Sequence, residues 1–338
     1  MTKLNKINKD NIIFYSKKYF CEKILFQWEN FTEKLILRKL KINEKKNKII
    51  DFCVYFWGDE FTSMLTYSLI PSLLQENNVP KLLKEKYLIN LNLYIKSEWD
   101  STKLDVYLKN ANLRNYFNLT INKVPSSNIN DKYFLTLCHY KASKKSFENG
   151  SIFSLLAPDL FFGDGSIYNI VKLVDEKNFG YTANPPRVLK NETLSFVANN
   201  LKNNNLSNLE LLKFALKNLH SSNEINSFNP NNSLEKFNKN LIISTFSRKT
   251  CNFIRLNRSD ISIFRIYHDF NLLDKHWPRK LFLEGRLKSI SDPYIYFHVE
   301  LTDENEKQFS YDLSENSNKN NLNLINLVNN SSSSTWKI

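Results

Sequence analysis

The chain predicts an α/β fold with a mostly parallel sheet, on three observations. Strand-like and helix-like patterns alternate four times between residues 49 and 177, which is typical of doubly wound sheets. Hydrophobic residues make up 42% of the 338 residues, which supplies a sizeable core. One short apolar run ends in acidic residues on a glycine-containing turn, and open α/β sheets place their ligands at such strand ends.

The individual elements follow from the period of the apolar residues. Strands are expected at 49–56, 88–95, 116–124, 152–156 and 181–183. Helices are expected at 61–74, 100–110, 131–148, 166–177, 192–203 and 206–219. Pro71 lies inside the first of these helices and predicts a kink or break there.

The chain divides into four expected parts. Residues 1–48 carry two basic helices, and residues 49–230 form the Rossmann-like domain. Residues 231–312 form a C-terminal α+β part, with strand-like runs at 240–246, 261–267 and 293–301. Residues 313–338 are dominated by Asn and Ser, which predicts a flexible tail.

The formal net charge is +13, and thirteen Lys and Arg residues fall within the first 48 positions. Three explanations remain open for this charge. It can form the solvated face of the N-terminal helices, attract an anionic membrane surface, or bind nucleic acid.

Cysteine usage and missing motifs narrow the class of protein. The four Cys, at 21, 53, 138 and 251, have neither metal-type spacing nor a disulfide pattern, which favours a reducing compartment. No apolar run approaches the 18 residues of a membrane span, so a cytoplasmic protein is expected. The sequence has no phosphate-binding GxxxxGK[ST] loop, GxGxxG fingerprint, GxSxG elbow or HExxH pair, which weakens kinase, dehydrogenase, hydrolase and zinc-site interpretations.

The run from Ser151 to Ser166 carries the chemistry. Asp159 follows an expected strand, and Asp164 follows five residues later in Asp-Gly-Ser. Two carboxylates can hold a divalent cation, and that cation can hold a nucleotide diphosphate. The alternative for both residues is a structural role, because Asp is also common in turns and at helix N-caps.

Three segments resemble the GT-A class of glycosyltransferases, and the resemblance spans residues 50–185. They are Phe56-Trp-Gly-Asp-Glu60, the helical run Lys141–Gly150, and Ser154-Leu-Leu-Ala-Pro-Asp-Leu-Phe-Phe162. The first resembles the nucleotide-cradling loop of that class, the second the helix before its metal-binding strand, and the third its DXD strand end. The first Asp of DXD falls on Ala157 here, and only Asp159 matches the last. The run to Arg187 also resembles uncharacterised bacterial glycosyltransferases with a PD…DGS pattern.

The resemblance implies a Rossmann-like domain that binds a nucleotide-sugar donor with Mn²⁺ or Mg²⁺. Asp159, Asp164 and His268 are the expected metal ligands. Asp100 is the acidic residue expected to contact the nucleotide, and its alternative is a helix N-cap. Trp57 can stack on a base or sugar, or pack in the core. Arg187 can pair with a phosphate, or with a surface carboxylate.

The function expected is therefore a cytoplasmic glycosyltransferase. It would move a sugar from a nucleotide sugar to a glycan or lipid-linked acceptor in surface polysaccharide synthesis, with residues 231–312 on the acceptor side. The basic helices would hold it near anionic lipid at the inner membrane face. Two alternatives stay open: a basic nucleic-acid-binding protein, which explains the charge but not the α/β pattern, and a glycosyltransferase-like scaffold without activity, which Ala157 permits.

Overall fold

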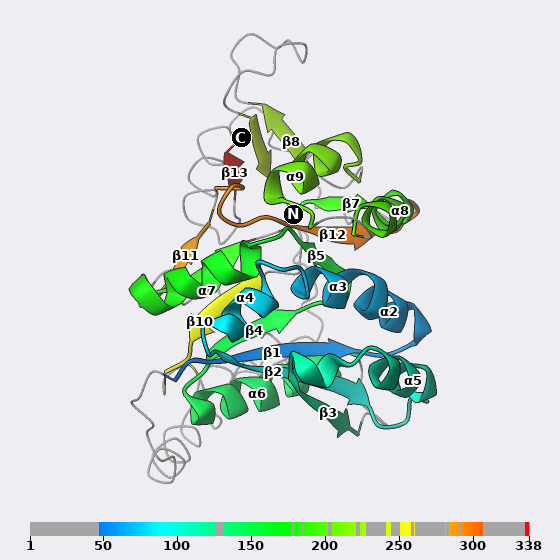
Figure 1. Ribbon diagram of the computed structural model, residues 1–338, viewed down its shortest axis with the longest axis vertical. Helices are drawn as coiled ribbons and strands as arrows, with labels where there is room; N and C mark the ends of the chain where they lie inside the picture. The colour runs from blue at the N-terminus through cyan, green and yellow to red at the C-terminus, as the bar shows by residue number, and fades with distance from the viewer. Residues whose placement is uncertain are drawn as a thin grey trace, which may run out of the picture.

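The computed structural model describes the α/β core of the chain (Figure 1). The described residues are 47–125, 131–177, 179–183, 185–201, 205–220, 224–227, 241–244, 251–257, 260, 281, 284–290, 292–306 and 335–337. The two expected N-terminal helices, the expected strand at 261–267 and most of the expected tail lie outside these residues.

A seven-stranded sheet dominates the described part of the chain. Its strands are β1 (Ile49–Phe56), β2 (Leu88–Lys96), β3 (Asn118–Val124), β4 (Ile152–Leu156), β6 (Gly180–Ala183), β10 (Cys251–Arg255) and β11 (Leu287–Ser289). They lie in the order β11-β6-β10-β4-β1-β2-β3, and only β10 runs antiparallel to its neighbours. The order β3-β2-β1-β4 is that of doubly wound α/β sheets, which confirms the predicted fold class.

Helices cover both faces of this sheet (Figure 1). They are α2 (Asp59–Met64), α3 (Ile70–Leu73), α4 (Val79–Lys84), α5 (Thr102–Asn110), α6 (Asp131–Asn149), α7 (Ser166–Lys177), α8 (Lys190–Asn200) and α9 (Asn208–Lys217), with a π-helical turn η1 (Leu65–Leu69) and a 3₁₀ turn η2 (Leu113–Asn115). Within the described residues, no helix combines the length and the apolar character needed to cross a membrane.

The kink or break predicted at Pro71 takes the form of a π-helical turn within a continuous helical segment, because the residues at both junctions keep right-handed helical dihedral angles. The expected helix 61–74 is divided into α2, η1 and α3, and Pro71 stands in the first turn of α3. A proline has no N–H to donate, so it is tolerated in the first turn of a helix and interrupts a regular helix elsewhere.

Alternation along β1 separates two apolar layers. Ile50, Phe52 and Val54 belong to the larger core cluster, whereas Cys53 belongs to a second cluster with Phe134 and Cys138 of α6. Helix α6 packs on β1 and β4, on the opposite face from α4 and α7. Since successive side chains of a strand point to opposite faces, one apolar strand serves both layers.

A polar cluster beneath α6 ties that helix to the sheet. The buried carboxylate of Asp51 accepts hydrogen bonds from Asn90 (2.6 Å), Asn149 (3.2 Å) and the hydroxyl of Ser151. These partners come from β2, the end of α6 and the residue before β4. Because a buried carboxylate needs such donors, the cluster fixes where β4 begins.

Two smaller sheets complete the described structure. One has the order β5 (Leu160–Phe162), β12 (His298–Thr302), β7 (Arg187–Leu189), and the other β13 (Thr335–Lys337), β9 (Leu241–Ser244), β8 (Glu224–Ser227). The sequence patterns did not predict β5, β7, β8, β10, β11 or β13, and β13 lies within the range expected to form a flexible tail. The strand expected at 293–301 begins only at His298. Strands β10, β11 and β12 come from the range expected to form the C-terminal part, and the domain boundaries stay predictions.

Candidate functional site

The strand order places the candidate site at the carboxyl ends of the central strands of the main sheet. From β1 the chain moves outward through β2 to β3, and it then returns to place β4 on the other side of β1. Such a reversal opens a crevice beyond the carboxyl ends of the two central strands, where α/β proteins bind ligands. In this chain the rule predicts the switch-point crevice beyond Phe56 and Leu156, the last residues of β1 and β4.

The register aligns the two loops. Val54 of β1 pairs with Leu156 of β4, so Trp57 and Asp159 each lie three residues beyond the same level of the sheet. Both predicted residues therefore lie beyond the carboxyl ends of two adjacent parallel strands. Sequence spacing could not show this, because a hundred residues separate them.

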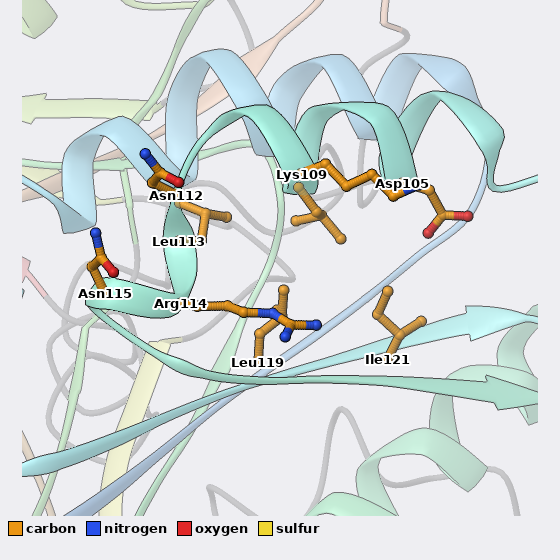
Figure 2. Close-up of a pocket in the computed structure, with 9 residues that line it drawn as sticks. Asp105, Lys109, Asn112, Leu113, Arg114, Asn115, Leu119 and Ile121 are labelled. Carbon is orange, nitrogen blue, oxygen red and sulfur yellow. The ribbon is translucent and has the colours of Figure 1, made fainter.

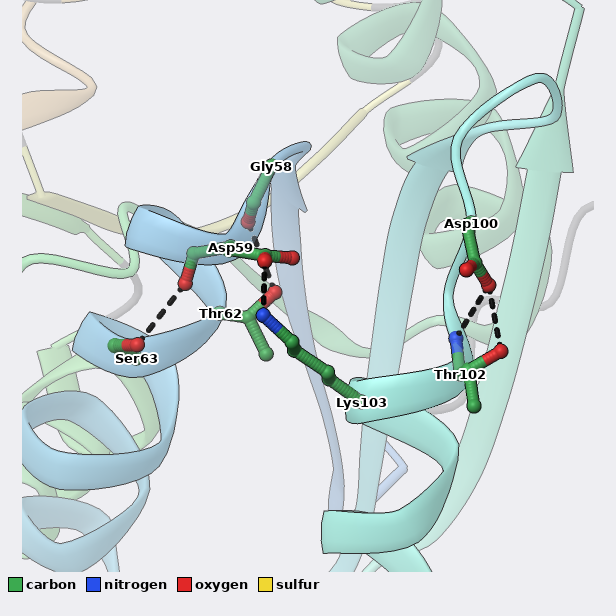
Figure 3. A network of polar contacts seen from close by, with 7 residues as sticks. All are labelled: Gly58, Asp59, Thr62, Ser63, Asp100, Thr102 and Lys103. Atoms are coloured by element: carbon green, nitrogen blue, oxygen red, sulfur yellow. Dashed lines mark hydrogen bonds and ion pairs between the residues drawn. The ribbon is translucent and has the colours of Figure 1, made fainter.

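The loop after β1 is held by its backbone and by one ion pair (Figure 3). Gly58 has a φ of 88°, and its carbonyl accepts hydrogen bonds from the amide (3.1 Å) and hydroxyl (2.9 Å) of Thr62. A side chain at Gly58 would meet no atom within 4 Å, so the loop faces open space there. The carboxylate of Asp59 pairs with Lys103 of α5, which links this loop to the one after β2.

Trp57 is partly buried against α6. Its ring lies edge-on to Phe134, with centroids 5.3 Å apart, and Nζ of Lys96 lies 4.2 Å from the Trp57 ring centroid. These contacts correspond to the packing role that the sequence left open, with a cation–π contribution. Stacking of Trp57 on a base or sugar stays a prediction.

Asp100 stands at the start of α5 (Figure 3). Its Oδ1 accepts hydrogen bonds from the backbone N–H (3.0 Å) and the hydroxyl (2.6 Å) of Thr102. These hydrogen bonds hold the pKa of the exposed Asp100 carboxyl below its usual value, so it is ionised at neutral pH. Its contacts are those of a turn that opens a helix, and its contact with a nucleotide stays a prediction.

Asp159 is buried at the junction of β4 and β5, 3% exposed. A tight turn places it there, because Leu160 donates a hydrogen bond to the carbonyl of Ala157 (3.3 Å). The backbone of Asp159 also connects the two sheets, since its carbonyl accepts from the N–H of Leu301 on β12 (2.9 Å). A carboxylate is thus placed where the main sheet, the small sheet and the crevice meet.

Asp164 lies at the far end of β5, about 10 Å further along the chain than that junction. Both of its carboxylate oxygens accept from Asn77, from the backbone N–H at 2.8 Å and from Nδ2 at 2.6 Å. Its own N–H donates to the carbonyl of Leu206 (2.7 Å). The structure does not bring Asp164 together with Asp159.

The described residues do not fit a divalent metal ion. Among them, no three His, Cys, Asp or Glu side chains approach closely enough to hold one. Ala157 occupies the place of the first DXD carboxylate, Asp164 is engaged elsewhere, and His268 lies outside the described residues. We therefore derive no step that passes through a metal.

Arg187 of β7 is engaged with carboxylates of the small sheet. Its guanidinium lies 3.6 Å from the buried Glu300 and 2.5 Å from Glu306, and its Nε donates to the hydroxyl of Thr302 (3.1 Å). The pair with the exposed Glu306 is the surface ion pair that the sequence offered as the alternative to phosphate binding, whereas Glu300 is buried. Phosphate binding stays a prediction.

Lys190, the first residue of α8, was not found from the sequence. Its ammonium lies 2.6 Å from Glu60 in the first turn of α2 and 3.3 Å from Asp303 beyond β12, and its side chain is only 17% exposed. Burial disfavours the charge, but the hydrogen bonds to Glu60 and Asp303 outweigh it and raise the pKa of Lys190. The only sequence signal for Lys190 was that it is a second basic residue, three positions after Arg187 and at the end of a short strand.

A separate shallow hollow lies between α5, η2 and the edge strand β3 (Figure 2). Its volume is about 550 Å³, with Leu119 and Ile121 on the strand side and Lys109 and Asp105 on the helix side. The charges of both signs around it favour no particular ligand, so the switch-point crevice remains the candidate site.

Comparison with known proteins gives weak likenesses. No protein-family model matches the sequence, and no curated protein matches it. A Bacillus anthracis structure assigned as a glucose-1-phosphate thymidylyltransferase, in complex with a sucrose, is 7% identical, with a TM-score of 0.37 over 75% of this chain and 89% of that chain.

Two structures of the S. cerevisiae mannosyltransferase Ktr4p are similar at the same level. One is 8% identical with a TM-score of 0.31 (69% of this chain, 65% of that chain), and the GDP complex is 6% identical with a TM-score of 0.30 (70% and 66%). TM-scores below 0.5 do not establish a shared fold, so the assignment of the fold rests on the strand order of this chain alone.

Proposed function

We propose that this protein is a transferase that uses a nucleotide-activated sugar. The observation that carries the proposal is the switch point between β1 and β4, since Asp159 and the Trp57–Glu60 loop each follow the carboxyl end of one of these two strands. Open α/β sheets with this strand order bind nucleotides at that crevice. A buried carboxylate at its border suits hydrogen bonding to the hydroxyls of a donor sugar.

In this proposal, cationic side chains balance the negative charge of the diphosphate. Arg187 lies in β7 and Lys190 directly follows that strand. Each forms ion pairs with carboxylates. A diphosphate would compete with Glu60 and Asp303 for the Lys190 ammonium. Because little of Lys190 is exposed, its charge would act more strongly on a leaving diphosphate than a charge in open water.

A thermal-shift screen tests this proposal. Nucleoside diphosphates and nucleotide sugars are added to the full chain, each with Mn²⁺ and with a chelator. A ligand that binds only the native state must raise the melting temperature, so at least one compound is expected to do so. Equal shifts with metal and chelator support charge balance by side chains, whereas shifts only with Mn²⁺ support the predicted metal site.

Lys190→Gln is the informative variant, with Lys213→Gln on the exposed face of α9 as the control. We expect Lys190→Gln to lose the ligand-induced shift and Lys213→Gln to keep it. The shift is measured against each variant's own melting temperature, because Lys190→Gln also removes two ion pairs. Absence of any shift with all nucleotides would count against the function as a whole.

The proposal extends to a glycan or lipid-linked acceptor and to a cytoplasmic enzyme near the inner membrane face. Its support is the net charge of +13, since anionic lipid attracts basic segments. Cell fractionation checks the location: the protein should sediment with the inner membrane at low salt and be released at high salt. Recovery outside the cytoplasmic compartment contradicts this part.

A further inference from the structure

A buried serine of the π-helical turn η1 is hydrogen-bonded to the strand that follows Asp159. The side chain of Ser68 is fully buried, and its hydroxyl donates to the carbonyl of Leu160 at 2.9 Å. The helical segment from α2 to α3, which contains η1, lies beside β5 (Figure 1). The bond therefore joins the segment that follows β1 to the first residue of the small sheet.

The turn that carries Ser68 has an unusual backbone. The N–H of Ile70 donates to the carbonyl of Leu65, five residues earlier, where an α-helix would use the residue four earlier. Single π-helical turns are rare and occur frequently at functional sites. Within this turn the hydroxyl of Thr66 bonds inside the helix, to the carbonyl of Ser63 (3.0 Å), whereas the hydroxyl of Ser68 leaves the helix toward β5.

Three hydrogen bonds hold the backbone on the carboxyl side of Asp159. The N–H of Leu160 closes the tight turn onto the carbonyl of Ala157, and the N–H of Leu301 donates to the carbonyl of Asp159. Ser68 holds the next peptide group, through the carbonyl of Leu160. Two successive peptide groups are thus fixed from β12 and from η1. Because the rotamers open to a side chain depend on its backbone dihedral angles, these bonds restrict the direction of the Asp159 carboxylate.

We propose that Ser68 is a positioning residue for Asp159. This inference rests on the proposed function, because Ser68 acts through the candidate site carboxylate and does not touch the substrate itself. The Ser68 hydroxyl keeps the peptide group after Leu160 from rotating, so the Asp159 carboxylate keeps its direction while a donor sugar binds and reacts. A small displacement of a reacting or binding group lowers the rate strongly, even when its cause lies outside the site.

A purely structural role is the alternative for Ser68, since any buried hydroxyl that satisfies a buried carbonyl stabilises the fold. Ser72 of α3 offers the matched comparison. It is fully buried in the same helical segment, and its hydroxyl donates to the carbonyl of Leu69 at 2.7 Å. The bond of Ser72 stays within the helix, whereas that of Ser68 reaches β5. The two serines therefore match in burial and differ in what their hydroxyls hold.

The variants Ser68→Ala and Ser72→Ala of the full chain separate the two roles. Each loses one buried hydrogen bond to a backbone carbonyl, so their melting temperatures should fall by similar amounts. NMR of chain labelled with ¹³C at the Asp carboxyl carbons observes Asp159 directly, and its resonance is identified by its loss in Asp159→Asn. We expect the chemical shift of the Asp159 carboxyl to change in Ser68→Ala and to keep the parent value in Ser72→Ala.

Steady-state kinetics gives the second readout, with the nucleotide sugar that raises the melting temperature most. Turnover of Ser68→Ala should fall about fivefold or more, and by a larger factor than KM rises, because a misdirected carboxylate disturbs the transition state more than the bound substrate. Ser72→Ala should keep its turnover within about twofold of the parent. If circular dichroism shows that Ser68→Ala does not fold, Ser68→Cys takes its place, since it fills the space and leaves only a weak donor.

The NMR readout separates this inference from the proposed function. An unchanged Asp159 resonance in Ser68→Ala, or an equal change in Ser72→Ala, would overturn the positioning role whatever the activity. An equal fall of turnover in both variants would assign Ser68 to stability alone. If the resonance changes only in Ser68→Ala and the parent chain transfers no sugar, Ser68 still orients Asp159, and the transferase function is the part that fails.

Discussion

Asp159 and Asp164 are the same residue type, five positions apart, and they flank the same three-residue strand β5. Asp164 has both carboxylate oxygens hydrogen-bonded to Asn77, within a turn that joins three helices. Asp159 is buried beyond the carboxyl end of β4, and its carbonyl accepts a hydrogen bond from β12. Two aspartates of the same strand therefore differ in role because the fold gives them different neighbours: Asp164 has a structural role, and Asp159 is the candidate site residue.

The region around Asp164 is held together largely by amide side chains. Gln75 donates to the carbonyl of Phe162 (2.7 Å), and Asn78 both donates to the carbonyl of Gly163 (3.2 Å) and accepts from the N–H of Ile167 (3.0 Å). These bonds satisfy buried backbone groups at the end of β5 and in the first turn of α7. Mutations in this turn are therefore expected to lower the stability of the fold, whereas mutations at the junction around Asp159 are expected to lower activity.

The largest expected effect is that of Asp159→Asn on sugar transfer. The amide keeps the size of the side chain and removes its charge, so turnover should fall about 1,000-fold, equivalent to about 4 kcal/mol. Steady-state kinetics and the melting temperature are measured together. If the melting temperature falls strongly together with activity, Asp159 has a structural role like that of Asp164. The proposed difference between the two carboxylates would then be wrong.

Gly163→Ala is expected to have the largest effect on stability. A Cβ at Gly163 would lie 2.1 Å from Oδ1 and 2.9 Å from the Cα of Asn208, so the free energy of unfolding should fall by about 3 kcal/mol. Urea unfolding measures it. Gly285→Ala is the control: its φ is +71° but its Cβ meets no atom within 4 Å, so about 1 kcal/mol is expected.

Asp164→Ala should cost about 2 kcal/mol of unfolding free energy, because two hydrogen bonds to a charged acceptor are lost. Turnover should change by less than twofold. Asp164→Asn should recover part of the stability, since its amide oxygen can still accept from Asn77. A loss of turnover in Asp164→Ala as large as that of Asp159→Asn would remove the distinction between the two carboxylates.

The smallest expected effect is at Ser207, which bridges to Asp164 and caps α9. Ser207→Ala should cost about 1 kcal/mol at neutral pH. The side-chain and backbone hydrogen bonds from Ser207 lower the pKa of Glu210, so this stabilisation is complete above the unfolded value of about 4.3 and is lost as pH falls through the lower folded value. The unfolding curves of parent and variant should therefore differ at neutral pH and move closer together at acidic pH. A difference that stays constant with pH would contradict the capping box.

Local patterns alone determined the framework of the fold. The strands at 49–56 and 152–156 and the helix at 166–177 have the bounds that their apolar periods predicted. These segments can be recognised in the sequence because each carries enough apolar residues to fill one face, and because turn residues flank them.

Tertiary structure alone decided the rest. Strands β5 and β7 have only three residues each, and they exist because β12, more than a hundred residues away, pairs with both. The pairing of β12 with β7 places Lys190 near Asp303, and the packing of α3 against β5 gives Asp164 its partner Asn77. A sequence pattern reports what a segment can bury, whereas the partners of its charged and polar groups depend on which distant segments the folded chain brings beside it.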